Sequence, residues 1–409
     1  QALNDYEFIG ELALTGELRA IDGVLPAALA AKNAGRKMVV PFGNSAEAGL
    51  AQSDGIFTAR TLMEVVHHLR GERTLPKANM QMDYIEAPML DMADVRGQHS
   101  ARRAMEIAAA GGHHILLIGS PGCGKTLLAS RLPGILPMAS DEEAIDSAAI
   151  ASVSGRGLDL TRFRQRPFRS PHHTSSAVAL VGGGTMPKPG EISLAHNGVL
   201  FLDELAEWDR KSLEVLRQPL ESGTVSISRA SNTAEFPARF QLVAAMNPCP
   251  CGWFGDNSGR CRCTMDAIER YRGKLSGPLL DRIDIHLAMT RLHHEELHLN
   301  AAPGECSALI RERVIRTRDL QKNRTGVCNA HLSQAQLKEH CQLSTQNQDL
   351  LDKAMNTLQL SARATYRILR VARTIADLAG SEHINTPHLA EAIQYRQLDR
   401  ALAMPKRRG

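Results

Sequence analysis

Eight residues at positions 119–126, GSPGCGKT, have the types and spacing of a loop that binds phosphate groups. The apolar run HHILLIG leads into them and a helix-compatible segment follows, which is the context that makes this spacing specific. Glycines allow backbone N–H groups to surround phosphate oxygens, and a helix N-terminus adds partial positive charge. We expect Lys125 to contact the terminal phosphates and Thr126 to bind Mg²⁺. The sequence therefore predicts an ATP site formed by Gly119, Ser120, Pro121, Gly122, Cys123, Gly124, Lys125 and Thr126.

Asp203 and Glu204 end a second apolar run, GVLFLDEL. At the end of a buried strand, Asp203 would hold Mg²⁺ through water, and Glu204 would orient or deprotonate the attacking water. Taken alone, the pair is equally well explained as two solvated acids at a strand end. Combined with the phosphate loop, it predicts hydrolysis of ATP by water rather than phosphoryl transfer to a metabolite.

Four of the eight cysteines lie in NPCPCGWFGDNSGRCRC, as two C-x-C pairs separated by nine residues. Four thiolates in one loop are enough for a tetrahedral Zn²⁺ site, and the turn-forming residues between the pairs would fold the second pair back. The sequence favours structural zinc over two alternatives, an iron–sulfur cluster and reduced or disulfide-bonded thiols. The expected zinc ligands are Cys249, Cys251, Cys261 and Cys263.

The elements that must position these residues follow from the hydrophobic pattern. HHILLIG, GVLFLDE and FQLVAAMN are nearly continuous apolar runs, typical of strands buried on both faces of a parallel sheet. Strand signals vanish after about residue 305, where helical periodicity dominates. The sequence predicts an α/β fold with a small N-terminal domain at 1–71, a linker at 72–84, a central domain at 85–304 and a helical domain at 305–409.

The totals describe an ordinary globular protein. Of 409 residues, 43% are hydrophobic and 22% charged, and the formal charge of +4 is too small to prove a nucleic-acid partner. No apolar run approaches the roughly 18 residues needed to span a bilayer, so no membrane partner is expected. The cysteine pattern does not match a secreted disulfide framework, which favours a cytoplasmic protein. The chain begins with Gln rather than Met, as a fragment would.

Longer stretches carry a resemblance to a known family: RPFRSPHHTSSAVALVGGG, PGEISLAHNGVLFLDELAEW, LRQPLESG, AAMNPCPCG, SGPLLDRIDIH and ARATYRILRVARTIADL. Over essentially its whole length the chain resembles AAA+ ATPases of the magnesium-chelatase-like branch, specifically the bacterial competence family ComM/YifB. The resemblance implies an AAA+ P-loop ATPase core with a parallel sheet, a helix-2 insert, a pre-sensor hairpin and an α-helical lid.

The resemblance also implies roles for two further residues of the core. Asn247, after FQLVAAM, matches sensor 1, which hydrogen-bonds the γ-phosphate or the lytic water. Arg282 in GPLLDRID matches the arginine finger, which reaches the γ-phosphate held by a neighbouring subunit. An ordinary ion pair with Asp281 or Asp284 is the alternative explanation of Arg282.

In the lid, Arg363 matches sensor 2, and we prefer it to Arg367, which lies one turn further on the same helix face. Because a finger acting from a neighbour completes the site only at a subunit interface, the working species should be a closed ring. A homo-hexamer is what the family implies.

The N-terminal segment GELALTGELRAIDGVLPAALAAKNAG resembles the C-terminal half of the S5-like domain of Lon proteases. The position that matches the lysine of the protease dyad is Ala27, and the half that would carry the nucleophile is not in this sequence. The resemblance therefore predicts a partial S5-like α/β domain without protease activity, used for docking or DNA entry.

A sequence-tolerant grip on DNA needs cationic side chains that face phosphates. The basic segment RGLDLTRFRQRPFRSPHHTSS and the hairpin-like segment TVSISRASNTAEFPARF offer such side chains. Pairing with acids or exposure on a solvated face is the alternative for each of them. The two adjacent histidines His172 and His173 lack partners at metal spacing and predict no metal site. The expected DNA contacts are Arg164, Arg166, Arg169 and Arg229.

Together these features predict an ATP-driven ring helicase that acts on single-stranded and branched DNA. By resemblance it would promote branch migration during natural transformation and homologous recombination. The alternative is the ATPase subunit of a magnesium-chelatase-type or other protein-remodelling complex, which would act on a protein partner. The expected cofactors are ATP, Mg²⁺ and structural Zn²⁺.

Overall fold

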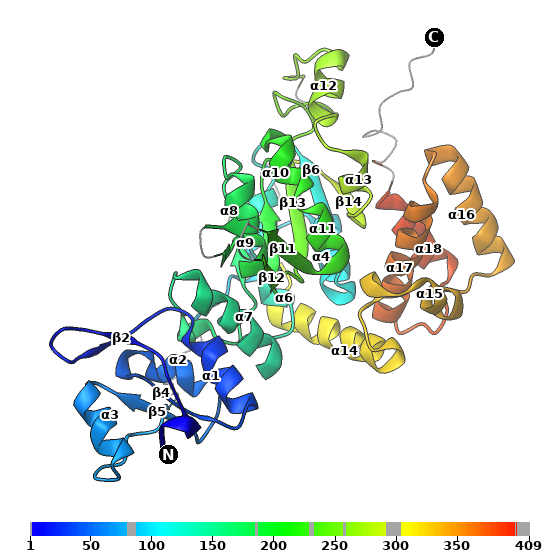
Figure 1. The fold of residues 1–409 in the computed structure, drawn as a ribbon. Helices are drawn as coiled ribbons and strands as arrows, with labels where there is room; N and C mark the ends of the chain where they lie inside the picture. Colours follow the sequence, from blue (N-terminus) through cyan, green and yellow to red (C-terminus); the bar gives the residue numbers. More distant parts are fainter. Residues whose placement is uncertain are drawn as a thin grey trace.

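The computed structural model describes residues 2–79, 87–184, 187–228, 233–256, 259–291, 304–396 and 398. Three units follow one another along the chain: a small N-terminal α/β unit in blue, a central α/β unit in cyan to green, and a helical unit in yellow to red (Figure 1). The predicted succession of an α/β core and a helical lid is confirmed.

The central unit is built on a five-stranded sheet in which every pair of neighbouring strands is parallel. Every residue of the three central strands is buried, which is why their sequences are continuous apolar runs. In spatial order the strands are β14 (Ile285–Met289), β6 (Ile115–Gly119), β13 (Gln241–Met246), β10 (Val199–Leu202) and β7 (Phe168–Arg169).

Alternate residues of β6 enter two different cores. Ile115 and Leu117 pack on one face with the alanine-rich helix α4 (His99–Gly111) and the lid helix α17 (Ala362–Leu378). Leu116 and Ile118 pack on the other face with residues of α9 (Glu191–Leu194), α10 (Arg210–Glu214) and the intervening loops. The sheet is therefore the middle layer between two helical layers.

The remaining elements of the central unit are one helix of 14 residues, α7, and several short helices and hairpins. The segment predicted to form a hairpin does so, and the hairpin tip, which includes Arg229, lies outside the described residues. These elements are α5 (Lys125–Ala129), α6 (Leu132–Ile135), α7 (Asp141–Ser154), α8 (Ala177–Val181), the β8 (Gly182–Gly183) and β9 (Lys188–Pro189) hairpin, α11 (Arg217–Ser222), the β11 (Thr224–Ser228) and β12 (Thr233–Pro237) hairpin, α12 (Met265–Arg272) and α13 (Gly277–Leu280).

The N-terminal unit has its own three-stranded parallel sheet with an apolar core. Its elements are β1 (Tyr6–Phe8), the β2 (Glu11–Leu12) and β3 (Leu18–Arg19) hairpin, α1 (Val24–Asn33), β4 (Lys37–Pro41), α2 (Ser45–Gly49), β5 (Ile56–Ala59) and α3 (Leu62–Leu69).

Two contacts fix how this unit continues into the rest of the chain. Part of the predicted linker pairs with β5, because Thr58 N–H donates to Pro76 O and Ala78 N–H donates to Ile56 O, both at 2.8 Å. Residues 76–78 thus extend the N-terminal sheet, and residues 80–84 of the predicted linker lie outside the described residues. Ala148 of α7 is buried in the N-terminal core, so the two α/β units pack directly together.

The lid is held together by a buried charge. The Asp377 carboxylate accepts hydrogen bonds from Arg324 at 2.7 and 2.8 Å, from Arg373 at 3.1 Å and from Asn329 at 2.8 Å. The lid helices are α14 (Ser307–Thr325), α15 (Gln334–His340), α16 (Thr345–Leu358), α17 and α18 (Thr386–Gln394).

Within the described part of the chain, no helix combines the length and apolar character needed to cross a bilayer.

Leu117 is fully buried at the centre of β6, so truncating it removes apolar contacts and leaves a cavity. Leu117→Ala should lower the free energy of unfolding of the central unit by about 2–5 kcal/mol. Leu309→Ala is the matched control, because Leu309 is 52% exposed on α14 and should change stability by less than about 0.5 kcal/mol. Urea unfolding followed by the fluorescence of Trp208 and Trp253 measures both, and equal midpoints would contradict the assigned core.

Candidate nucleotide site and cysteine knob

The phosphate loop and the predicted sensor 1 residue meet at one edge of the sheet. Lys125 Nζ donates to Gly119 O at 2.6 Å, to Ser120 O at 3.1 Å and to Asn247 Oδ1 at 3.1 Å. These residues come together because β6 and β13 are parallel neighbours with Ile118 opposite Met246, so the segments after them emerge side by side. The structure thus unites Lys125 and Asn247, which are far apart in the sequence.

The loop backbone has the conformation that a phosphate cradle requires. Gly122 and Gly124 have φ values of +77° and +92°, a region that residues with a side chain rarely adopt. A Cβ on Gly119 would lie 2.6 Å from Cys123 Sγ, so this position also has no room for a side chain. Burial raises the pKa of the Cys123 thiol, which agrees with a structural role for that residue.

Oxygen ligands for a divalent cation converge beside the loop. Thr126 Oγ1 donates to Asp203 Oδ2 at 2.7 Å, and the backbone carbonyl of Asp203 accepts a hydrogen bond from Trp208 Nε1 at 2.9 Å. A hydroxyl next to a carboxylate is the donor set that Mg²⁺ takes in combination with phosphate oxygens. The residues present therefore fit an ATP–Mg²⁺ complex.

Glu204 is presented by a strained backbone and is contacted by a histidine. Its φ is +50°, which is uncommon for a residue with a side chain, and such conformations cluster at functional sites. Its Oε2 lies 2.9 Å from His173 Nδ1. The sequence pattern alone assigns no site to His173. Its contact with Glu204 could have been inferred from its position just after β7, the neighbour of β10, because the segments after these two strands emerge at the same sheet edge.

The four cysteines after Asn247 form one cluster, the cysteine knob (residues 249–263). Their Sγ atoms all lie within 4.8 Å of one another. The Cys249–Cys251, Cys251–Cys261 and Cys249–Cys261 distances are 3.4, 3.7 and 3.9 Å. Tetrahedral Zn²⁺ with bonds of 2.3 Å places sulfurs about 3.8 Å apart, so the geometry fits this ion. The backbone N–H of Trp253 lowers the pKa of the Cys251 thiol to about 6.

The cysteine knob touches the phosphate loop directly. A Cβ built on Gly252, whose φ is +84°, would lie 2.7 Å from Pro121 Cδ. Arg272 of α12 donates to Pro248 O at 3.1 Å and so ties the start of the knob to the helix that follows it. The knob is therefore held between the phosphate loop on one side and α12 on the other.

Arg282 lies at the opposite edge of the sheet from the phosphate loop. It precedes β14, whose first residue, Ile285, pairs with Ile115 at the start of β6. The phosphate loop begins at Gly119, which ends β6 opposite Met289. Four steps of extended strand, about 13 Å, separate these two edges.

The immediate partner of Arg282 is neither of the two acids considered from the sequence. Its side chain is 10% exposed, forms an ion pair with Glu221 of α11 and donates to Pro278 O at 2.6 Å. Glu221 itself is 63% exposed. Asp284, one of those two acids, is instead bonded to Arg367 and His113.

A pocket of about 220 Å³ brings the lid arginines to Arg282. Arg363 is exposed there, whereas Arg367 is half-buried and bonded to Asp284, which leaves Arg363 as the freer cation of the two sensor 2 candidates. The pocket is lined by Glu221, Asp281, Arg282, Gln334, Arg363, Tyr366, Arg367 and Arg370. The structure therefore groups Arg363 with Arg282 rather than with Lys125.

Two arginines predicted to contact DNA form ion pairs within the chain. Arg166 is 9% exposed and pairs with Glu143 at 2.8 Å, and Arg169 binds Glu191 through two nitrogens at 2.7 and 3.0 Å. Burial opposes ionisation of Glu191, but the hydrogen bonds from Arg169 hold its pKa below the usual value. In this chain both side chains are engaged by acidic partners, and their contact with DNA stays a prediction.

Arg164 differs from its neighbours. Its side chain is 48% exposed and lies 3.4 Å from the exposed Asp141. Of the arginines predicted to contact DNA, Arg164 is the one that the structure describes as accessible, and Arg229 lies outside the described residues.

Comparison with protein families matches the magnesium chelatase subunit ChlI to residues 91–297, the C-terminal part of that subunit to residues 304–396, and a further ChlI model to residues 1–44. Competence protein ComM of Haemophilus influenzae is 48% identical over 405 residues, which cover 98% of this chain and 79% of that protein. Uncharacterized protein YifB of Escherichia coli is 46% identical over 400 residues with the same coverage.

A more distant relative is the DNA replication licensing factor Mcm6 of Drosophila melanogaster, 23% identical over 216 residues, which are 50% of this chain and 25% of that protein. The phosphate loop, the acidic pair and the parallel sheet agree with the family matches, and the identity extends along nearly the whole sequence. The chain belongs to the ComM/YifB family of magnesium-chelatase-like AAA+ ATPases.

Proposed function

We propose that this protein is an ATP-driven ring motor that moves on DNA and promotes branch migration during natural transformation and homologous recombination. In this proposal Lys125 and the phosphate-loop backbone bind the triphosphate, while Thr126 and Asp203 hold Mg²⁺. Glu204 activates the attacking water, and Asn247 orients that water or the γ-phosphate. When bound, Mg²⁺ neutralises the charge that develops on the phosphate oxygens.

The ring assembly is supported by one observation: the proposed catalytic residues lie at two opposite edges of one sheet. Lys125 and Arg282 of the same chain are separated by the length of β6 and β14, so Arg282 is not placed to serve its own phosphate loop. A second copy whose Arg282 edge faces the phosphate loop completes the site. Repetition of that head-to-tail contact closes a ring, which we take to be a homo-hexamer. Arg363 would act from the same side as Arg282, because both line one pocket.

DNA as the polymer is supported by the relatives and by one exposed cation. One relative is named a competence protein and another a DNA replication licensing factor. Arg164 is accessible on the central unit, and the β11–β12 hairpin follows α11 in the same unit. Phosphate contacts of this kind would give a grip that tolerates any base sequence.

The second candidate is a protein-remodelling ATPase of the magnesium-chelatase type. It is favoured by the family models, which carry the name of a magnesium chelatase subunit. Such an enzyme would use the same nucleotide site but would be stimulated by a protein partner rather than by nucleic acid. The response of hydrolysis to DNA therefore separates the two candidates.

We further propose that the cysteine knob holds a structural Zn²⁺ ion. Three of the sulfurs lie 3.4–3.9 Å apart, close to the spacing of a tetrahedral site, and the fourth lies within 4.8 Å of them. The knob also connects Asn247 to the surface of the phosphate loop at Pro121. A cross-linked knob would be stiff, so a movement of the strand end at Asn247 would be passed on rather than absorbed.

The roles of Lys125 and Glu204 predict different failures. Lys125→Ala should abolish ATP binding, because the loop loses its cation for the terminal phosphates. Glu204→Gln should bind ATP normally but lower turnover by at least about a hundredfold, because the water loses its base. Lys188→Ala, an exposed lysine away from the loop, is the control for nonspecific charge loss. Normal turnover by Glu204→Gln would refute its assignment.

Single-stranded DNA should stimulate ATP hydrolysis several-fold at low salt, and the apparent DNA affinity should fall steeply as salt rises. Arg164→Ala should weaken that affinity for all sequences and reduce the salt slope by about one. Hydrolysis assays at two salt concentrations with single-stranded, branched and duplex DNA measure this. Absence of stimulation by every nucleic acid would favour the remodelling candidate.

The purified protein should contain about one zinc ion per chain, measured by elemental analysis. Cys249→Ser combined with Cys261→Ser should lose the zinc and lower ATP turnover, whereas Cys306→Ser, which lies outside the knob, should keep both. Iron in place of zinc would point to the iron–sulfur alternative. A zinc-free double variant with normal ring assembly and DNA-stimulated hydrolysis would remove the mechanical role of the knob.

A further inference from the structure

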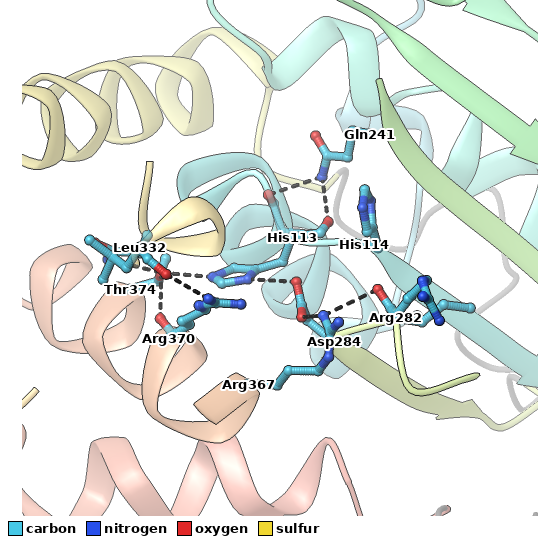
Figure 2. A network of polar contacts seen from close by, with 12 residues as sticks. His113, His114, Gln241, Arg282, Asp284, Leu332, Arg367, Arg370 and Thr374 are labelled. Carbon is cyan, nitrogen blue, oxygen red and sulfur yellow. Dashed lines mark hydrogen bonds and ion pairs between the residues drawn. The ribbon is translucent and has the colours of Figure 1, made fainter. Parts of the chain in front are cut away.

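A buried polar network joins the lid to the segment that carries Arg282 (Figure 2). Its centre is Asp284, which is 2% exposed and precedes β14. One carboxylate oxygen of Asp284 lies 3.1 Å from Nδ1 of the fully buried His113, and the other pairs with Arg367 of α17. Burial alone would raise the pKa of Asp284, but Arg367 and His113 hold it well below the usual value, so the carboxylate is charged.

The lid helix is attached to this network at two points on one face. His113 Nε2 lies 2.8 Å from Thr374 Oγ1, while Arg367 contacts Asp284. Thr374 and Arg367 are seven residues apart, which is two turns of α17 and puts them on the same side of the helix. His113 therefore bridges the lid and Asp284. Figure 2 shows His113, Asp284 and the α17 residues Arg367 and Thr374 close together.

The same lid also holds the backbone on either side of the network. Arg367 Nη1 donates to Arg282 O at 3.2 Å, and Arg396 Nη1 donates to Ile283 O at 2.5 Å. Two consecutive carbonyls and the side chain of the next residue, Asp284, are thus bound by arginines of the lid. A rotation of the lid away from this edge would leave the buried carboxylate without its cation, which is strongly unfavourable.

We infer that Arg367 is the positioning residue of the arginine finger, and that the His113–Asp284–Arg367 network makes α17 and Arg282 move as one body against the neighbouring subunit's nucleotide. This inference rests on the proposed role of Arg282 in a neighbour's site. In this role Arg367 acts through the backbone and not on the nucleotide. It fixes the backbone from which Arg282 extends, and it adjoins Arg363 on the same helix.

The inference is tested by mixing inactive variants of the full-length chain. Arg282→Ala should lower turnover by about 10³-fold or more, and Arg367→Ala by about tenfold to a hundredfold, as expected for a displaced catalytic group. Both should bind ATP as the unaltered protein does, because their phosphate loops are intact. The exposed lid arginine Arg316 provides the control, and Arg316→Ala should keep full turnover.

Mixed rings then report which chain each residue serves. In random equimolar rings of Lys125→Ala and Arg282→Ala chains, about one interface in four combines an intact loop with an intact finger, so hydrolysis should reappear. Lys125→Ala mixed with Arg367→Ala should recover in the same way, because the Lys125→Ala chain supplies a correctly held finger. Arg282→Ala mixed with Arg367→Ala should show no recovery, because neither chain supplies one.

Each failure has a separate meaning. No recovery in the Lys125→Ala and Arg282→Ala mixture refutes the proposed finger. Recovery there without recovery for Lys125→Ala and Arg367→Ala refutes the positioning role alone, as does full turnover by Arg367→Ala. If Arg367→Ala does not bind ATP, the double variant Asp284→Asn with Arg367→Gln, which buries no unpaired charge, replaces it in the same mixtures and must give the same pattern.

Discussion

Parallel strands send all their carboxyl ends to one edge of a sheet, and this constraint organises the whole protein. It brings the phosphate loop, Asp203, Glu204 and Asn247 together although more than a hundred residues of sequence separate the first from the last. The same constraint sends Arg282, which precedes its strand, to the other edge. We call these the nucleotide edge and, after the proposed role of Arg282, the finger edge. In the proposed reaction neither edge is sufficient alone.

Each edge is reinforced in a different way. At the nucleotide edge the cysteine knob rests on Pro121, so the reinforcement is a loop whose four thiols lie together. At the finger edge it is a buried ion pair between Asp284 and a lid helix. This ion pair attaches the lid to the edge of the sheet that carries Arg282 in the same chain. The N-terminal unit packs on α7 and lies away from both edges.

Local patterns predicted most of this arrangement. Residue spacing and hydrophobicity are sufficient to predict features that lie in one short stretch of sequence. These features are the phosphate loop, the acidic pair, the three central strands, the hairpin and the cysteine cluster. What could not be predicted depends on distant partners. Arg166 looks like a surface cation until Glu143 is seen beside it, and His173 gains a role only because β7 lies next to β10. Asp284 reads as an ordinary acid after Arg282, since nothing local reveals His113 and Arg367.

The close approach of Gly252 to Pro121 has an evolutionary consequence. Any side chain at position 252 would collide with the proline ring, and the backbone there already has a conformation that favours glycine. A lineage that keeps this loop architecture is thus confined to glycine after the second cysteine. Loss of that glycine in a homologue would mark a chain whose knob has been released from the nucleotide edge, whatever its cysteines have become.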